Sequence, residues 1–328
     1  MLGRRDLLIG LAAAGAGAAA QTPPPRSGGR LLPGLGEPGE TVDLWPQGAP
    51  GAPRVLPVET VDERSKDVDL TDRAVHGILR PRMVVFRPAV PNGAAILVTP
   101  GGGYRWVVID KEGYEVARWL SARGFTVFVL FYRLPGEGWA AGPNVALSDA
   151  QRAMRLIRHR ARDWGVMPDR IAAMGFSAGG HVCADLATRF NAETYRAVDA
   201  ADRLSARPDL AAPIYAVQSM TPPLAHPGSR TLLLGPDPTP ELERAHTPAA
   251  NVTKRTPPTF LVHAEDDSTV PVGNTLEFRA ALVAAGVPVE THLFANGGHG
   301  FGLRRAMGKP AAAWPDLFQA WTRSMGLI

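Results

Sequence analysis

The chain has 328 residues, of which 45% are hydrophobic, and a formal net charge of +4. This is enough for one large domain with a well-buried core, although length alone also allows two domains. The single cysteine, Cys183, excludes an intrachain disulfide. The basic residues are scattered, and their densest run, RLIRHRARDW, has helical spacing. It indicates a solvated helix face rather than a surface for nucleic acid.

The first twenty residues, MLGRRDLLIGLAAAGAGAAA, have twin arginines at Arg4 and Arg5, a short apolar core and small residues at the end. This pattern predicts a signal peptide over residues 1–20, and GRRDLLIG resembles the twin-arginine consensus without its leading Ser or Thr. We expect cleavage near Gln21, a periplasmic or extracellular protein, and no stable membrane association after cleavage. An uncleaved membrane anchor is the alternative.

Residues 21–41 are rich in Pro and Gly and predict a linker, so we expect a single catalytic domain over residues 42–328. Strand-like and helix-like runs alternate through this domain, with an irregular, proline-rich stretch at 190–256 that suits a loop or small cap. The alternation predicts an α/β fold with a mostly parallel central sheet and helices on both faces. The runs that carry this prediction are, for strands, MVVFRP, AAILVTP, FTVFVLFY, IAAMGF, AAPIYAV, TFLVHA and VPVETHLF and, for helices, EGYEVARWLSARG, ALSDAQRAMRLIRHRARDWG and TLEFRAALVAAG.

The motif GFSAG has Ser177 at its centre, between an apolar strand-like run and helix-forming residues. Glycines on both sides permit a tight turn that holds the serine oxygen above the sheet on a strained backbone. The N-terminus of the following helix would stabilise negative charge at the same place. The motif therefore predicts a nucleophilic serine. The alternative is a small-residue turn needed only for close packing of helix on strand.

A nucleophilic serine needs a base and an orienting acid, which follow it in the order acid, then His, in an open α/β sheet. The run FLVHAEDDSTVP ends a predicted strand and offers Glu265, Asp266 and Asp267. We favour Asp267 because DSTVP matches the D-x-x-V-P turn that follows the acid strand in many such enzymes, while Asp266 and Glu265 are alternatives. The run VETHLFANGGHGF ends the next strand and places His299 in a glycine-rich loop, so we predict His299 as the base.

The run VTPGGGYRW exposes backbone N–H groups at the end of another strand. We assign an oxyanion hole to Gly102, Gly103 and Ala178, the last of which directly follows Ser177. The alternative, a phosphate-binding loop, lacks a G-x-G-x-x-G or GK[ST] pattern.

We assign Tyr104, Arg105, Trp106 and Trp139, which lie in loops at the predicted site, as candidate substrate-binding residues that could stack on a sugar, although aromatic packing beneath a loop is the interpretation we favour. His181 lies one turn after Ser177, and we expect it either to line the site or to be hydrogen-bonded locally. No Cys, His or Glu cluster has the spacing of metal ligands, so we expect neither a metal nor a cofactor.

These motifs resemble those of α/β-hydrolase-fold esterases. More narrowly, the chain is similar to bacterial acetyl xylan esterase-like proteins, often grouped with feruloyl and other carbohydrate esterases. The resemblance implies Ser177 as nucleophile, Asp267 as acid and His299 as base, with the PGGG loop shaping the oxyanion site. Pro100 stands where many hormone-sensitive-lipase relatives have His, which favours the carbohydrate-esterase branch. The matching stretches, over about residues 42 to 303, are LWPQGAPGAP, PGGGYRWVVIDKEGYEVARWLSARGF, YRLPGEGWAAGP, DAQRAMRLIRHRARDWGVMPDRI, GFSAGGHVCADLATR, HAEDDSTVPVGNTL and GGHGFG.

The sequence thus predicts an exported serine esterase acting on a small-molecule or oligosaccharide ester, with an acetylated xylan or related oligosaccharide favoured. We expect no nucleic-acid partner. Three alternatives remain: a carboxylesterase of broad specificity for small esters, a serine peptidase-like protein, and a non-catalytic protein on the same fold. The complete Ser, Asp and His set argues against the last of these.

Overall fold

The computed structural model describes residue 38 and residues 40–328. The predicted signal peptide and nearly all of the predicted linker therefore lie outside the described residues. The first strand, β1 (Glu40–Asp43), begins two residues before the expected start of the domain at residue 42. Within this described part of the chain, no helix is long and apolar enough to cross a membrane.

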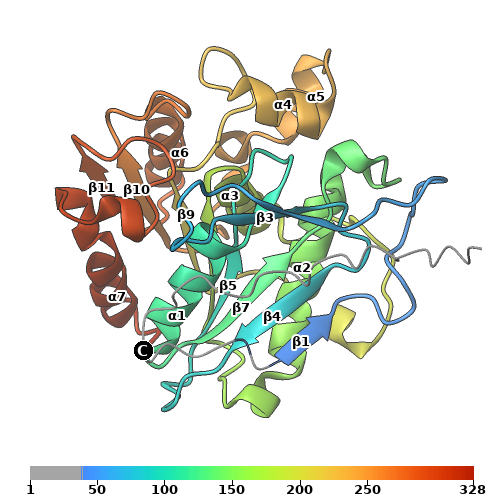
Figure 1. Cartoon of the computed structure of the whole chain (residues 1–328), viewed down its shortest axis with the longest axis horizontal. Coiled ribbons are helices and arrows are strands. Elements are labelled where there is room, and N and C mark those ends of the chain that lie inside the picture. Colours follow the sequence, from blue (N-terminus) through green and yellow to red (C-terminus); the bar gives the residue numbers. More distant parts are fainter. Residues whose placement is uncertain (1–37, 39) are drawn as a thin grey trace, which may run out of the picture.

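An eight-stranded sheet forms the centre of the domain (Figure 1), with the strand order β1-β4-β7-β5-β8-β9-β10-β11. β4 is antiparallel to β1 and β7, and the strands from β7 to β11 run parallel. Its central strands are buried along their whole length because their sequences are nearly continuous apolar runs. Besides β1, the strands of this sheet are β4 (Arg82–Phe86), β5 (Ala95–Thr99), β7 (Thr126–Phe131), β8 (Ile171–Phe176), β9 (Leu210–Ile214), β10 (Thr259–Ala264) and β11 (Val289–Phe294).

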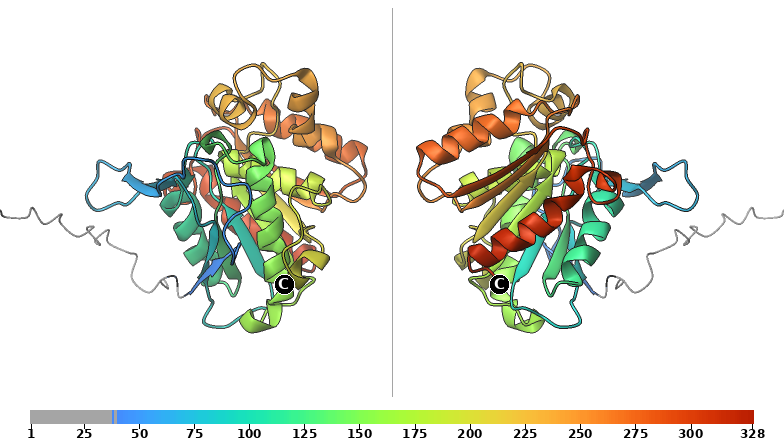
Figure 2. Two further views of the ribbon diagram at one scale, coloured as in Figure 1. Left: turned by 90° about the vertical axis from the view of Figure 1, so that its right-hand side faces the viewer. Right: turned by 90° about the vertical axis from the view of Figure 1, so that its left-hand side faces the viewer.

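Helices cover both faces of this sheet, which confirms the predicted α/β architecture. α1 and α7 lie on one face, and α2, α3 and α6 lie on the other (Figure 2). α2 ends at His159 and a separate 3₁₀ turn follows it, so the long helix expected from the run ending at Gly165 is shorter than predicted. The helices are α1 (Glu115–Ser121), α2 (Val145–His159), α3 (Ser177–Arg189), α4 (Pro227–Leu234), α5 (Pro240–Ala245), α6 (Gly273–Ala284) and α7 (Trp314–Ser324).

Two smaller parts flank the central layers. The first holds the short helices α4 and α5, which come after β9 and stand apart at the top of Figure 1. It corresponds to the middle of the irregular stretch that the sequence predicts as a loop or small cap. The second is an antiparallel sheet of β2 (Thr60–Glu63), β3 (Arg73–His76) and β6 (Val107–Val108), whose β2–β3 hairpin projects from the body (Figure 2).

Candidate active site

Ser177 stands at the junction of β8 and α3 and has a positive φ of 52°. A Cβ atom at Gly175 would overlap the carbonyl oxygen of Gly179, and one at Gly179 would overlap the carbonyl oxygens of Thr99 and Pro100. Glycine is therefore required on both sides of the serine, because a larger residue would push the helix away from the strands. The turn places Ser177 at the carboxyl end of β8, where the sequence predicts it.

Three side chains from separate strand ends meet at this point. Ser177 Oγ lies 2.8 Å from His299 Nε2, and His299 Nδ1 lies 2.7 Å from Asp267 Oδ2. Asp267 follows β10 and His299 follows β11, and these strands are parallel neighbours, so both residues emerge at the same edge of the sheet. An ionised Asp267 only accepts, which places the imidazole proton on Nδ1 and leaves Nε2 to accept from the Ser177 hydroxyl.

The surroundings of Asp267 keep it ionised. Burial alone would raise the pKa of Asp267, but hydrogen bonds from His263 and His299 outweigh it and hold that pKa well below its usual range. The backbone N–H groups of Thr269 and Val270 also donate to Asp267 Oδ1, each at 2.9 Å. The DSTVP turn, on which the prediction of Asp267 rested, thus supplies backbone N–H donors to its carboxylate.

The two competing acids have other positions. Asp266 Oδ1 accepts from the N–H groups of Gly297 and Gly298 at 2.8 and 2.7 Å, so it holds the loop that leads to His299. These backbone bonds lower the pKa of Asp266. Glu265 is exposed, and its N–H donates to the carbonyl of Phe294. Only Asp267 contacts the imidazole of His299 among these three acids.

The glycine-rich loop after β5 faces Ser177. A Cβ at Gly101 would lie 3.0 Å from Ser177 Cβ, and the next residues, Gly102 and Gly103, have φ values of 135° and 65°. In the described part of the chain, the N–H groups of Gly102 and Gly103 meet no hydrogen-bond acceptor, and α3 has no side-chain cap at its first turn. The free N–H groups of this loop and of Ala178 are the donors that an oxyanion hole needs.

Tyr104 and His181 are buried and hydrogen-bonded to each other, which agrees with packing for Tyr104 and with the hydrogen-bonded alternative for His181 rather than with contact to substrate. Tyr104 is buried, and its hydroxyl lies 2.5 Å from His181 Nδ1. His181 Nε2 lies 2.7 Å from the carbonyl of His246, so both ring nitrogens of His181 are engaged. Burial lowers the pKa of His181, which favours the neutral imidazole. Because Tyr104 directly follows Gly103, this bond ties the end of the glycine-rich loop to α3.

Trp139 is also buried, whereas Arg105 and Trp106 face outward. The Trp139 ring packs on the Arg133 guanidinium, 4.8 Å from the ring centroid, and its Nε1 donates to Glu137. It is therefore not available for stacking on a sugar. Arg105 is exposed and Trp106 half-buried, with the guanidinium 5.3 Å from the Trp106 ring centroid. Of the four candidate residues for stacking on a sugar, these two alone are accessible.

The structure adds a residue pair that sequence reasoning missed. His226 precedes α4, and its Nδ1 accepts from the Ser229 N–H at 3.1 Å and lies 2.8 Å from Ser229 Oγ. Ser229 Oγ would lie 3.9 Å from a Cβ at Gly103, so the pair borders the oxyanion loop. Burial lowers the pKa of His226, and the nearby His299 lowers it further. The run HPGS carries a helix N-cap signal, which gives a local structural role but not this location.

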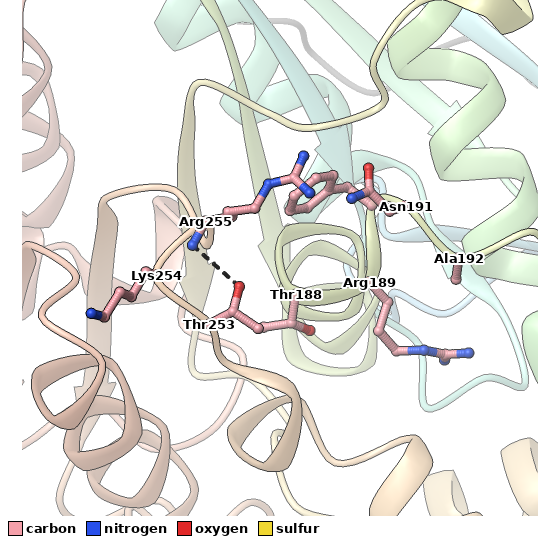
Figure 3. A pocket seen from close by; sticks show the side chains of 8 residues that line it. Thr188, Arg189, Asn191, Ala192, Thr253, Lys254 and Arg255 are labelled. Atoms are coloured by element: carbon pink, nitrogen blue, oxygen red, sulfur yellow. Dashed lines mark hydrogen bonds between the residues drawn. The ribbon is translucent and has the colours of Figure 1, made fainter.

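A separate hollow of about 500 Å³ lies at the opposite end of α3 (Figure 3), lined by residues 188–192 and 253–255. Since α3 has 13 residues, this hollow is about 20 Å from Ser177. Over the described residues, no group of three or more His, Cys, Asp or Glu side chains could hold a metal ion.

The family model BD-FAE matches residues 86–282, which is more than half of the chain. The chain belongs to the BD-FAE family. The matched residues include Ser177 and Asp267, and His299 lies beyond them.

Named relatives agree with this membership. The solved structure of an acetyl ester-xyloside bifunctional hydrolase from Caldicellulosiruptor lactoaceticus is 34% identical in sequence and has a TM-score of 0.73. The match covers 90% of this chain and 99% of that protein. The acetylxylan esterase of Xylanibacter ruminicola is 32% identical over 68% of this chain and 44% of its own length. The endo-1,4-beta-xylanase B of Butyrivibrio fibrisolvens is 36% identical over 62% of this chain and 32% of its own length. The chain thus spans less than half the length of these two curated relatives.

The fold is that of the α/β-hydrolase esterases. Esterase 2 of Thermogutta terrifontis has a TM-score of 0.62 and covers 84% of this BD-FAE chain at 22% identity, which bears on the fold alone. The predicted fold class and the predicted resemblance to acetyl xylan esterase-like proteins are therefore confirmed. The names of the relatives support an ester-hydrolysing enzyme.

Proposed function

We propose that this chain is an exported serine esterase that removes acetyl groups from xylan or other acetylated oligosaccharides. The observation that carries the esterase proposal is the hydrogen-bonded chain from Ser177 through His299 to Asp267, facing a loop of free N–H groups. The acetyl and xylan parts rest on the names of the similar proteins. The export part rests on the sequence of residues 1–20.

In the proposed reaction, Ser177 Oγ attacks the ester carbonyl carbon while its proton passes to His299 Nε2. The imidazolium that forms is stabilised by Asp267, and the carbonyl oxygen takes negative charge beside the N–H groups of Gly102, Gly103 and Ala178. When the tetrahedral intermediate collapses, the C–O bond to the alcohol breaks, and the leaving oxygen takes the proton from His299. An acyl-serine remains.

Water completes the cycle. His299 Nε2 accepts a proton from the attacking water, a second tetrahedral intermediate forms, and the bond between Ser177 Oγ and the acyl carbon breaks. The proton returns to Ser177, and the carboxylic acid is released. These acylation and deacylation steps require neither a redox step nor a metal ion.

A carboxylesterase of broad specificity is the second candidate, and a specific observation favours it. Tyr104 and Trp139 are buried, so two of the three candidate aromatic rings for stacking on a sugar are not exposed. Trp106 is the one candidate ring that is not buried, which gives little basis for selecting a sugar over a small alcohol.

The test measures acetate release from acetylated xylo-oligosaccharides beside hydrolysis of p-nitrophenyl acetate, with wild type and Ser177→Ala. Hydrolysis of both substrates that is lost in the variant supports the full proposal. Activity on the nitrophenyl ester alone supports the broad esterase. Failure of a fluorophosphonate probe to label Ser177 in folded protein would refute both candidate esterase functions.

Export is tested separately in cells. The precursor with Arg4 and Arg5 both changed to Lys should stay in the cytoplasm if the twin-arginine route is used, whereas wild type should reach the periplasm or medium without residues 1–20. Equal export of both forms would refute that route.

A further inference from the structure

A buried carboxylate that the reaction scheme does not use lies behind the oxyanion loop. Glu112 is 3% exposed and belongs to a single π-helical turn, Asp110–Tyr114, directly before α1. Such turns are frequent at functional sites. Glu112 Oε2 accepts a hydrogen bond from the Gly101 N–H at 3.0 Å. This bond turns the Gly101 N–H away from the proposed oxyanion, so Gly101 is not one of its donors.

The other oxygen of Glu112 reaches the side of the site that carries the histidine. The Tyr215 hydroxyl donates to Glu112 Oε1 at 3.1 Å and accepts from the Gly302 N–H, also at 3.1 Å. The Tyr215 ring packs edge-on against His299 and Phe301, with centroid separations of 5.5 and 4.6 Å. Burial, together with the neighbouring carboxylate, raises the pKa of Tyr215 well above its usual range, so the hydroxyl keeps the proton that it donates.

The backbone geometry shows why both loops need an outside support. Gly102 and Gly103 on one loop, and Gly298 and Gly300 on the other, all have positive φ. Glycine chains sample many conformations, so neither loop is rigid by itself. Tyr215, at the end of β9, also has a positive φ of 35°, a strain that persists only where the surroundings impose it.

We propose that Glu112 and Tyr215 form a positioning link that fixes the oxyanion loop and the His299 loop relative to each other. The inference rests on the proposed function and names two further residues for the same reaction. Neither residue touches a reacting atom: Glu112 acts through the Gly101 peptide, and Tyr215 acts through Gly302 and its ring contact with His299. Lys111 Nζ, 3.9 Å from Glu112 Oε1, offsets the buried negative charge.

The chemistry of two conservative variants separates the parts of the link. In Glu112→Gln, an amide oxygen can still accept from Gly101, but the amide nitrogen then faces the Tyr215 hydroxyl, which loses its acceptor. Tyr215→Phe removes the hydroxyl and keeps the ring against His299. Asp110→Asn is the matched control, because Asp110 is equally buried in the same turn but pairs with Arg73 at 2.7 Å, away from both loops.

The experiment measures kcat and KM for p-nitrophenyl acetate, and thermal unfolding, in wild type, the three single variants and the Glu112→Gln/Tyr215→Phe double variant. We expect kcat to fall by about 10- to 100-fold in Glu112→Gln with KM within about 3-fold, because small displacements of positioned groups cost this much. The double variant should lose little more than the worse single variant, since both break one link. Asp110→Asn should lower the unfolding temperature and leave kcat near wild type.

Three outcomes overturn the link: a wild-type kcat in a folded Glu112→Gln protein, a loss confined to KM, or losses that multiply in the double variant. If Glu112→Gln does not fold, Tyr215→Phe alone decides by its kcat. Wild-type protein without ester hydrolysis or Ser177 labelling refutes the proposed function itself. An active wild type with unaffected variants refutes only the link.

Discussion

The two ends of α3 differ in what surrounds them. At the N-terminal end, Ser177 and Ala178 are buried, backbone atoms leave no room for a side chain at Gly179, and the first N–H groups have no side-chain cap. At the C-terminal end, Lys254 and Arg255 are exposed around an open hollow (Figure 3). The N-terminal end has free backbone donors, and the C-terminal end has cationic side chains beside a hollow.

The helix dipole accounts for both ends. Its positive N-terminus stabilises the negative charge that an acyl-transfer reaction develops, and its negative C-terminus attracts cations. Arg189 in the last turn already donates to Asp185 at 3.1 Å and to Asn144 at 2.8 Å. The basic hollow therefore needs no anionic ligand to explain it, and a concave surface is a poorer guide to the site than packed glycines and free donors.

The largest expected loss of kcat comes from changing Asp267, which orients His299 at the N-terminal end of α3. We expect Asp267→Asn to lower kcat by about 10⁴-fold, because an amide at this position no longer selects the imidazole tautomer that accepts from Ser177. The measurement is kcat for p-nitrophenyl acetate at neutral pH.

Asp266→Asn is the matched control one residue away. Its amide oxygen can still accept from Gly297 and Gly298, so we expect kcat within about tenfold of wild type. The reverse order of losses would transfer the acid role to Asp266.

Gly179→Ala tests whether packing at this end sets activity. Alanine is the better helix former, yet its Cβ would overlap the carbonyl oxygens of Thr99 and Pro100. We expect a loss of about 1–3 kcal/mol in the free energy of unfolding and about 10²–10³-fold in kcat, since the displaced segment leads into the oxyanion loop. Urea denaturation and kcat measure the two losses.

Thr188→Ala, near the other end of the same helix, provides the comparison for Gly179→Ala. It removes a methyl group and a hydroxyl that donates to the carbonyls of Ala184 and Asp185 within the same helix. We expect it to cost about 1 kcal/mol with kcat unchanged. Equal losses of kcat in both variants would mean that α3 responds as a whole and that its two ends do not differ.

The site features that depend on local sequence could be predicted from the sequence. The strand–turn–helix at Ser177 and the strand ends before Asp267 and His299 follow from local glycine and strand patterns and from the order of parallel strands. Those patterns were sufficient to predict the three groups at one edge of the sheet and to predict the fold class, which the strand order confirms.

Residues whose position depends on distant partners could not be found in this way. The Tyr104 hydroxyl meets His181, 77 residues away in sequence, and Glu112 meets Tyr215, 103 residues away. The local sequence YRW does not determine whether the tyrosine side chain points to solvent or into the core. Which aromatic side chains reach the substrate is therefore fixed by packing between elements, and the burial of Tyr104 and Trp139 agrees with the favoured interpretation of aromatic packing.

His246 packs beside Asp185 and Arg189, in the C-terminal half of α3, and its protonation affects the stability of this end of the helix. Burial lowers its pKa to about 4. An unfolded histidine takes up a proton near pH 6.5, so between about pH 4 and 6.5 protons favour the unfolded state. The contribution is fully present above about pH 6.5 and is lost as the pH falls toward 4.

We expect His246→Asn to remove this dependence. The free energy of unfolding of wild type should fall by about 1 kcal/mol per pH unit more steeply than that of the variant across this window, as measured by urea denaturation. Activity at pH 7 should change little. Parallel curves for the two proteins would show that His246 does not titrate differently on folding.

The smallest expected effect concerns the open end. Lys254→Ala removes an exposed cation from the hollow, about 20 Å from Ser177, so we expect kcat/KM within about twofold of wild type on both p-nitrophenyl acetate and acetylated xylo-oligosaccharides. The two substrates make the result informative, because a long saccharide can reach this end of α3 and a nitrophenyl ester cannot. A loss on the oligosaccharide alone would make the hollow part of the substrate path, and the two ends of α3 would then serve one function. Unchanged activity on both substrates would confine the esterase to the packed end, where free N–H groups and the histidine loop face Ser177.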